Sequence, residues 1–133
     1  MSIIVTKPQI GNNAYSGWKN RIGSAGNVSV KFSIRNMSTK TIKYAVVYFT
    51  PFNRVGDAVK CSISGESTKA VKFTGPLRPM MTEKDIVFSD AWYNNTISGV
   101  VLDKVAVRYM DDTILEFNGK NVPSNIIGGL MKK

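Results

Sequence analysis

Alternation of apolar and polar residues with a period of two is the feature that most limits the fold of this chain. In the segment 28–34 every second residue is apolar: Val28, Val30, Phe32 and Ile34. Side chains of a β-strand point alternately to its two faces, so this pattern is typical of a strand with one buried and one hydrated face. Val105, Val107 and Tyr109 repeat it. No segment keeps the i, i+3, i+4, i+7 spacing of an amphipathic helix over three turns, which favours an all-β fold.

The segment 42–49 has apolar residues on both faces of its predicted strand, which indicates a central strand. Its aromatic residues Tyr44, Tyr48 and Phe49 interleave with Lys43, as in strands that stack on RNA bases, but we assign them to the core. Pro51 is expected to end the strand, since proline cannot donate to a ladder. Residues 53–57 are predicted to form a turn in which Gly56 takes positive φ.

Further short strands are predicted at 59–63, 71–73, 86–88, 105–110 and 113–117, with turns between them. Asp111 and Asp112 are interpreted as a tight turn, and 91–99 shows no clear period. Seven or so alternating strands predict two packed antiparallel sheets, a β-sandwich or a barrel. Segment 1–27 is predicted to be a short first strand at 3–5 followed by a Gly/Asn-rich arm or loop. Segment 28–117 is the sandwich, and 118–133 is a tail, as one helical turn or a docking segment.

The chain has no histidine and a single cysteine among its 133 residues. It therefore cannot build a Ser-His-Asp or Cys-His triad, a His-ligated zinc site or an internal disulfide. Cys61 alternates with Val59 and Ile63 and is assigned to the core. The acids form no metal-binding pattern, and no phosphate-binding glycine loop is present. We expect no enzyme activity, no catalytic residue, no metal and no cofactor.

Charge points to the class of partner. The chain has 18 Lys and Arg against nine Asp and Glu, a net charge of +9. Such a surplus favours anionic polymers or nucleic acid, although the basic residues are spread along the chain as on an ordinary solvated surface. Binding residues are predicted in the glycine-rich segment and at the C-terminus: Tyr15, Trp18, Lys19, Arg21, Lys132 and Lys133. The two aromatic rings either fold back over the end of the sandwich or form a contact surface.

Four blocks carry a resemblance to a known family: 40–57 with Thr50-Pro51-Phe52-Asn53, 74–79 with Thr74-Gly75-Pro76, 90–97 with Asp90-Ala91-Trp92-Tyr93, and 107–113. Over 28–117 the chain resembles small bacterial immunoglobulin-like β-sandwich domains of unknown function, similar in style to FxLYD-type domains. The resemblance implies an immunoglobulin-like antiparallel β-sandwich of about seven strands and no catalytic residues. The family pattern reads Met-Asp-Gly-Thr where this chain has Asp112 in place of the glycine.

These observations predict a non-enzymatic binding or assembly module. One concrete form is a structural subunit of a phage or another bacterial assembly, whose terminal arms add strands to a neighbour. The alternative is an accessory domain of the bacterial envelope that binds a protein partner or an anionic polymer through its basic surface. The sequence contains no signal peptide and no run long enough to span a membrane. A cytoplasmic or virion location is expected if Met1 is the native start, and an envelope location if it is not.

Overall fold

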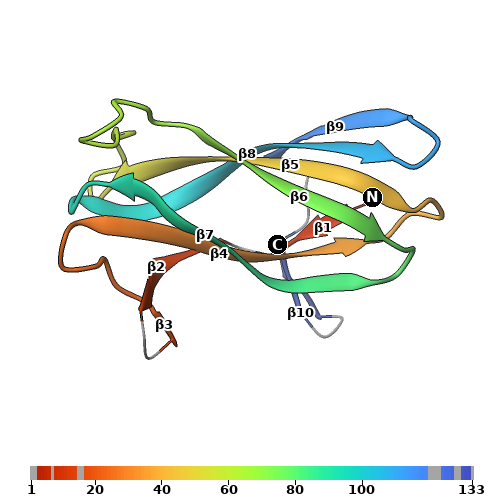
Figure 1. Ribbon diagram of the computed structural model, residues 1–133, viewed down its shortest axis with the longest axis horizontal. Helices are drawn as coiled ribbons and strands as arrows, with labels where there is room; N and C mark the ends of the chain where they lie inside the picture. The colour runs from red at the N-terminus through yellow and green to blue at the C-terminus, as the bar shows by residue number, and fades with distance from the viewer. Residues whose placement is uncertain (1–2, 7, 15–16, 120–123, 128–129, 133) are drawn as a thin grey trace.

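The computed structural model describes residues 3–6, 8–14, 17–119, 124–127 and 130–132, which form two stacked antiparallel sheets (Figure 1). The first sheet contains β1 (Ile3–Val5), β2 (Gln9–Ala14), β3 (Gly17–Lys19), β4 (Asn27–Asn36) and β7 (Thr82–Tyr93). The second sheet contains, in spatial order, β6 (Lys69–Leu77), β5 (Ile42–Asn53), β8 (Ile97–Tyr109) and β9 (Ile114–Asn118). A separate hairpin joins β10 (Ser124–Ile127) to β11 (Leu130–Lys132). The predicted antiparallel β-sandwich is confirmed, and the described residues include no α-helix.

The core lies between the sheets and is built from the alternating residues that the sequence indicated. Val28, Val30, Phe32 and Ile34 of β4 are all buried. They face Ala45, Val47 and Phe49 of β5 and Val105 and Val107 of β8. The rings of Phe32 and Phe49 meet edge to face at 5.2 Å, an arrangement favoured by aromatic quadrupoles. Period-two patterning therefore identified the inner faces of β4 and of residues 105–109 of β8 correctly.

The N-terminal segment is more regular than its composition predicted. Strand β1 pairs with the end of β4, and Ile3 and Val5 are fully buried in the core. The Gly/Asn-rich arm or loop predicted after the first strand instead contains β2 and β3. Glycine is required there for close packing, since a Cβ on Gly11 would lie 2.1 Å from the carbonyl oxygen of Lys19. Gly11 therefore allows β3 and the Trp18 ring to lie against β2.

Several predicted bounds in the middle of the chain are wrong: β6, β7 and β8 are all longer than predicted, and β8 begins at Ile97 and not at 105. Strand β5 continues through Pro51 to Asn53, and Pro51 pairs with Val100 of β8. Proline is tolerated because pairing of β5 with β6 ends at Phe49 and Lys69. Beyond that point Pro51 only accepts a hydrogen bond on this edge, from the backbone N–H of Val59 to its carbonyl oxygen at 3.1 Å. The strand predicted at 59–63 is an irregular loop in which Cys61 is buried but Ile63 is 74% exposed. Only the start of this run adjoins a strand, where Ala58 forms a bridge to Phe52 of β5 and the backbone N–H of Val59 donates to Pro51. The turn at 62–64 then ends the alternation.

The tail is a strand hairpin and not a helical turn, and it lies on the outer side of the first sheet (Figure 1). Strand β10 lies next to β1. This position explains why Ile4, whose side chain points away from Ile3 and Val5, is also buried. Strand β1 is therefore covered on both faces.

Strand β7 contains two matched irregularities, each built around an aspartate. Asp85 and Asp90 have positive φ values of 55° and 53°, and the register with β4 shifts near both of them. The backbone N–H of Asp85 donates to Ser33 Oγ at 3.0 Å, and that of Asp90 donates to Ser29 Oγ at 2.9 Å. Both serines are buried on the outer side of β4. Each β-bulge is thus satisfied by a serine hydroxyl from the neighbouring strand.

Replacing Ser29 with alanine is expected to lower the free energy of unfolding by about 1–3 kcal/mol, because the N–H of Asp90 loses its acceptor. Ser33→Ala should cost a similar amount, and the two effects should add if the bulges are independent. Urea unfolding followed by circular dichroism measures both. Ser89→Ala, an exposed position on β7, is the control and should stay within about 0.5 kcal/mol. A loss as small for Ser29→Ala would show that water serves the bulge equally well.

Candidate binding surfaces

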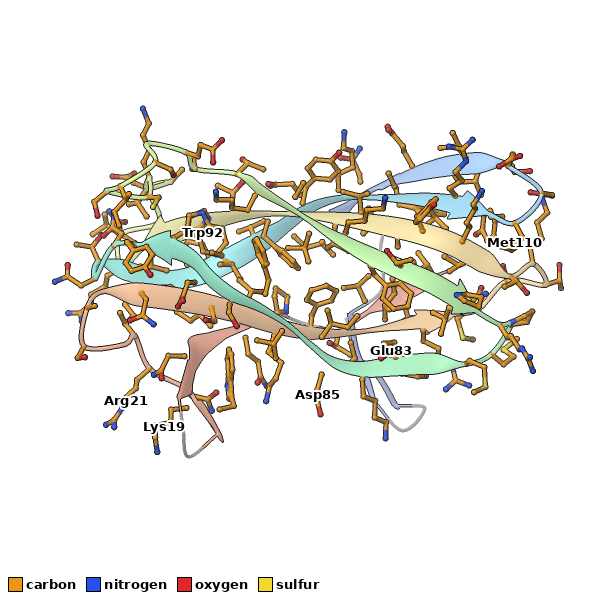
Figure 2. The ribbon with its side chains drawn as sticks, in the orientation of Figure 1. Lys19, Arg21, Glu83, Asp85, Trp92 and Met110 are labelled. Carbon is orange, nitrogen blue, oxygen red and sulfur yellow. The ribbon has the colours of Figure 1, made fainter. Side chains whose placement is uncertain are left out.

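The predicted binding residues of the glycine-rich segment lie on the β2–β3 hairpin, at the outer side of the first sheet. Trp18 is half-buried, and its Nε1–H donates to Asn20 Oδ1 at 2.6 Å. Lys31 of β4 places its Nζ 4.9 Å from the centre of the Trp18 ring, a contact that the sequence did not indicate. The ring therefore folds back onto its own sheet. Lys19 and Arg21 point away from the sandwich beside it (Figure 2).

The other predicted binding residues cannot be placed as a site. Tyr15 and Lys133 lie outside the described residues, and Lys132 is the last residue of β11. The structure therefore brings together Trp18, Lys19 and Arg21 and adds Lys31, while the C-terminal lysines stay a prediction.

The second sheet carries an aromatic surface that sequence reasoning assigned to the core. Phe49 is in the core as predicted, but Tyr44 and Tyr48 are only half-buried, on the outer face of β5. The assignment was wrong because both faces of β5 are rich in apolar and aromatic residues, and alternation alone does not say which face is inward. Ala45 and Val47, which alternate with the tyrosines, are buried, so the face of β5 that carries Tyr44 and Tyr48 is the outer one.

Lysines from two neighbouring strands cover these tyrosines. Lys72 Nζ of β6 lies 4.1 Å from the centre of the Tyr44 ring, and Lys43 Nζ lies 5.6 Å from it. Lys104 Nζ of β8 lies 4.6 Å from the centre of the Tyr48 ring. These are cation–π distances, and they arise from sheet register, since Tyr48 is directly opposite Lys104. We call Tyr44, Tyr48, Lys72 and Lys104 the tyrosine–lysine face.

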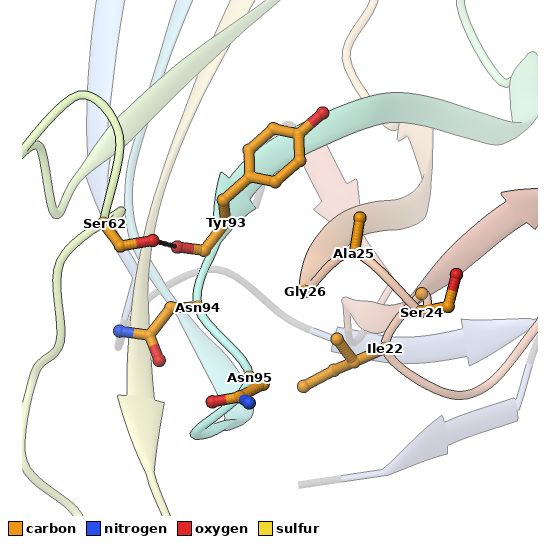
Figure 3. A pocket seen from close by; sticks show the side chains of 9 residues that line it. Ile22, Ser24, Ala25, Gly26, Ser62, Tyr93, Asn94 and Asn95 are labelled. Atoms are coloured by element: carbon orange, nitrogen blue, oxygen red, sulfur yellow. Dashed lines mark hydrogen bonds between the residues drawn. The ribbon is translucent and has the colours of Figure 1, made fainter.

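One end of the sandwich is hollowed between the loops. A cavity of about 630 Å³ lies between residues 22–26 and the β7–β8 turn, and Ser62, Tyr93, Asn94 and Asn95 also line it (Figure 3). A second cavity of about 420 Å³ lies on the other side of Asn95, against Arg54 and Val55. The linings combine hydroxyl, amide and backbone groups with apolar side chains, Ile22 in the first cavity and Val55 and Ile97 in the second. Arg54 is their one charged side chain within the described part of the chain.

The loop beside the first cavity holds the single cysteine. Cys61 is buried as predicted, and its Sγ accepts a hydrogen bond from the backbone N–H of Tyr93 at 3.2 Å. Burial raises the pKa of this thiol, but hydrogen bonds from Ser64 and from backbone N–H groups outweigh it and lower the pKa to about 7. No group of metal-ligating side chains lies near it in the described residues. The hydrogen bond to the sulfur joins this loop to the end of β7.

The acidic pair forms the turn that the sequence predicted. The side chain and backbone N–H of Thr113 donate hydrogen bonds that hold the pKa of Asp111 well below its usual range. Lys40 Nζ, 2.9 Å from the Asp111 carboxylate, acts in the same direction. Asp112 has a φ of 69° and lies within 4 Å of both Lys43 and Arg108. The pair therefore closes the β8–β9 hairpin.

Comparisons with known proteins leave the family open. No protein-family model, curated protein or solved structure matches the chain. Among the described residues, no helix has the length and apolar character to cross a membrane. The all-β sandwich of two antiparallel sheets is what the chain shares with the predicted family.

Proposed function

We propose that this protein is a non-enzymatic binding and assembly module. The observation that carries the proposal is the edge strand β9, which pairs with β8 on one side only. Ile114 and Leu115 on β9 are 57% and 42% exposed. The strand contains one charged residue, Glu116, and neither proline nor bulge. An exposed apolar edge of this kind is a template for pairing with another chain.

The other long edges carry features that oppose such pairing. Strand β6 places Lys69, Lys72 and Pro76 along its free edge. Strand β7 is interrupted by the bulges at Asp85 and Asp90. Lysine, proline and bulges are the means by which soluble sheets avoid edge-to-edge association. Of the edge strands β6, β7 and β9, the five-residue β9 is the one without such features, so we assign assembly to β9.

Assembly through the β9 edge differs from the assembly that the sequence predicted. The sequence predicted that terminal arms pair with a neighbouring molecule. In the structure β1 and β2 pair with β4 of the same chain, and Ile3 and Val5 fill its core. The proposed partner is therefore a second copy that adds to the β9 edge, in a phage or another bacterial assembly.

Light scattering behind size exclusion, on the full chain over a concentration series, tests the proposal. The wild type is expected to form a dimer or larger species, and Ile114→Glu with Leu115→Glu should be monomeric. Val55→Glu with Ile63→Glu is the matched control, because it adds the same charge at positions 78% and 74% exposed away from β9. This control should assemble like the wild type. A strict monomer at high concentration, or assembly lost equally in both variants, would contradict the proposal.

Membership in the FxLYD-like family is also a proposal. It is supported by Asp112, since the family pattern has glycine at the position where this chain has a φ of 69°. Asparagine and aspartate are the non-glycine residues that tolerate this conformation best. The alternative role, an envelope domain that binds an anionic polymer, is favoured by the lysines of the tyrosine–lysine face.

A further inference from the structure

We infer that the tyrosine–lysine face binds single-stranded nucleic acid. Tyr44 and Tyr48 point from the same face of β5 and are roughly 13 Å apart along the strand, at a rise of about 3.3 Å per residue. Half-exposed aromatic rings on a sheet are stacking platforms for unpaired bases, and nearby cations bind the phosphates between them. Each ring here has its own lysine within 5 Å of its centre.

The charges on this face favour an anionic ligand. Among the described residues, Lys72 and Lys104 have no carboxylate within 4.0 Å, whereas Arg108 and Lys43 share Asp112. Asp103 accepts a hydrogen bond from Thr50 Oγ1 at one margin of the face. Of the three lysines that lie on the tyrosine rings, Lys43 is thus paired with Asp112, and the charges of Lys72 and Lys104 are available to phosphate. When a phosphate draws the ammonium group aside, the ring face is released for a base.

The shape of the face favours a single strand over a duplex. The outer side of the first sheet carries the β2–β3 and β10–β11 hairpins, while no labelled strand lies over the outer side of the second sheet (Figure 1). Several side chains beside the tyrosines on this face are small. Ala70 of β6 is opposite Tyr48, and Ala106 of β8 is opposite Val46, which lies between the two tyrosines on β5. An open face of this kind has no element that could enter a groove of double-stranded DNA. It can lie along a strand whose bases are unstacked.

This inference concerns a different surface and ligand from the β9 edge, so each can fail without the other. The probe is a fluorescein-labelled oligothymidine of twenty nucleotides, titrated by fluorescence anisotropy at 50 mM salt. The wild type is expected to bind. Tyr44→Leu with Tyr48→Leu should weaken binding about ten-fold or more, since stacking of one base contributes about 1–3 kcal/mol. Tyr44→Phe with Tyr48→Phe keeps the rings and should restore most of the affinity.

Lysine variants measure the phosphate contacts. Lys72→Ala with Lys104→Ala should weaken binding and reduce the slope of log affinity against log salt by about 1.4, as expected for two contacts to a single strand. Lys60→Ala with Lys84→Ala removes the same charge at exposed positions away from the face and is the matched control. It should keep the wild-type salt slope. Circular dichroism and thermal melts confirm that each variant is folded.

Three results would overturn the inference. The first is absence of binding by the wild type at 50 mM salt. The second is equal affinity of the leucine variant and the wild type, because stacking then makes no contribution. The third is an equal loss in the two lysine variants, which would indicate general attraction by the net charge of +9. Heparin serves as a second probe, beyond these three results. If heparin binds more tightly than the oligonucleotide, and its binding does not depend on the tyrosines, the ligand of the face is an acidic polysaccharide instead.

Discussion

Replacing Trp92 with alanine is expected to lower the free energy of unfolding by about 3–5 kcal/mol, a large part of the stability of an ordinary domain. Trp92 is fully buried between the two sheets (Figure 2). Its Nε1–H donates to the carbonyl oxygen of Ser67 at 2.6 Å, so the side chain also holds the start of β6. The variant loses the apolar contacts, leaves a cavity and leaves that carbonyl without its donor.

Urea unfolding followed by circular dichroism measures this loss, and the chain supplies its own control. The other of its two tryptophans, Trp18, is half-buried on the outer side of the first sheet. Trp18→Ala removes the ring from Gly11 and Lys31, and should lower the free energy of unfolding by about 1 kcal/mol. Equal losses in the two variants would mean that Trp92 does not support the core as its burial implies.

Asn36→Ala is expected to lower the free energy of unfolding by about 2–4 kcal/mol, which is large for a polar residue next to a turn. The Asn36 side chain is fully buried and its Nδ2 donates to the carbonyl oxygens of Lys40 and Leu77, both at 2.8 Å. Its Oδ1 accepts from the backbone N–H and the hydroxyl of Ser38. One amide thus joins the end of β4 in the first sheet to the end of β6 in the second.

Two variants separate this bridging role from an ordinary turn. Asn94→Ala removes a similar set of bonds at the opposite end of the molecule, to Lys60 and Thr96, but at a half-exposed position. It should lower the free energy of unfolding by only about 1 kcal/mol, because water can replace the lost partners. If Asn36→Ala is no worse than Asn94→Ala, the amide does not join the sheets energetically.

Asn36→Asp adds a dependence on pH. The new carboxylate would be buried against two carbonyl oxygens, so its pKa in the folded state is raised above the unfolded value of about 4. The unfolded state then releases the proton first, and the stability of the variant falls as pH rises from about 4 through the raised pKa. Unfolding midpoints at pH 4 and pH 7 should therefore diverge in Asn36→Asp and coincide more closely in the wild type. The same midpoint difference in both proteins would contradict the placement of this amide.

The sequence by itself determined the fold class and the inner faces of β4 and of the second half of β8. Regular alternation in 28–34 and in 105–109 shows which side chains share a face, because the period of a strand is fixed by its backbone geometry. The turns at 53–57 and at Asp111 were predictable for a similar reason, since local backbone chemistry forms them. Burial of Cys61 was also predicted correctly, although the strand predicted around it is an irregular loop.

Tertiary structure alone decided which face of β5 is outward and which strands become neighbours. Tyr44 and Tyr48 alternate correctly, but only packing of β5 on β4 turns Phe49 inward and leaves the tyrosines to meet Lys72 and Lys104. Each of these lysines is at least 28 residues along the chain from the tyrosine that it covers, so no local sequence pattern connects the two residues. The pairing of Ser29 and Ser33 with the bulges of β7, and of Asn36 with the end of β6, are also contacts between distant segments. Local periodicity reports the faces of a strand, whereas the partners of a side chain depend on sheet register, which is set by the whole core.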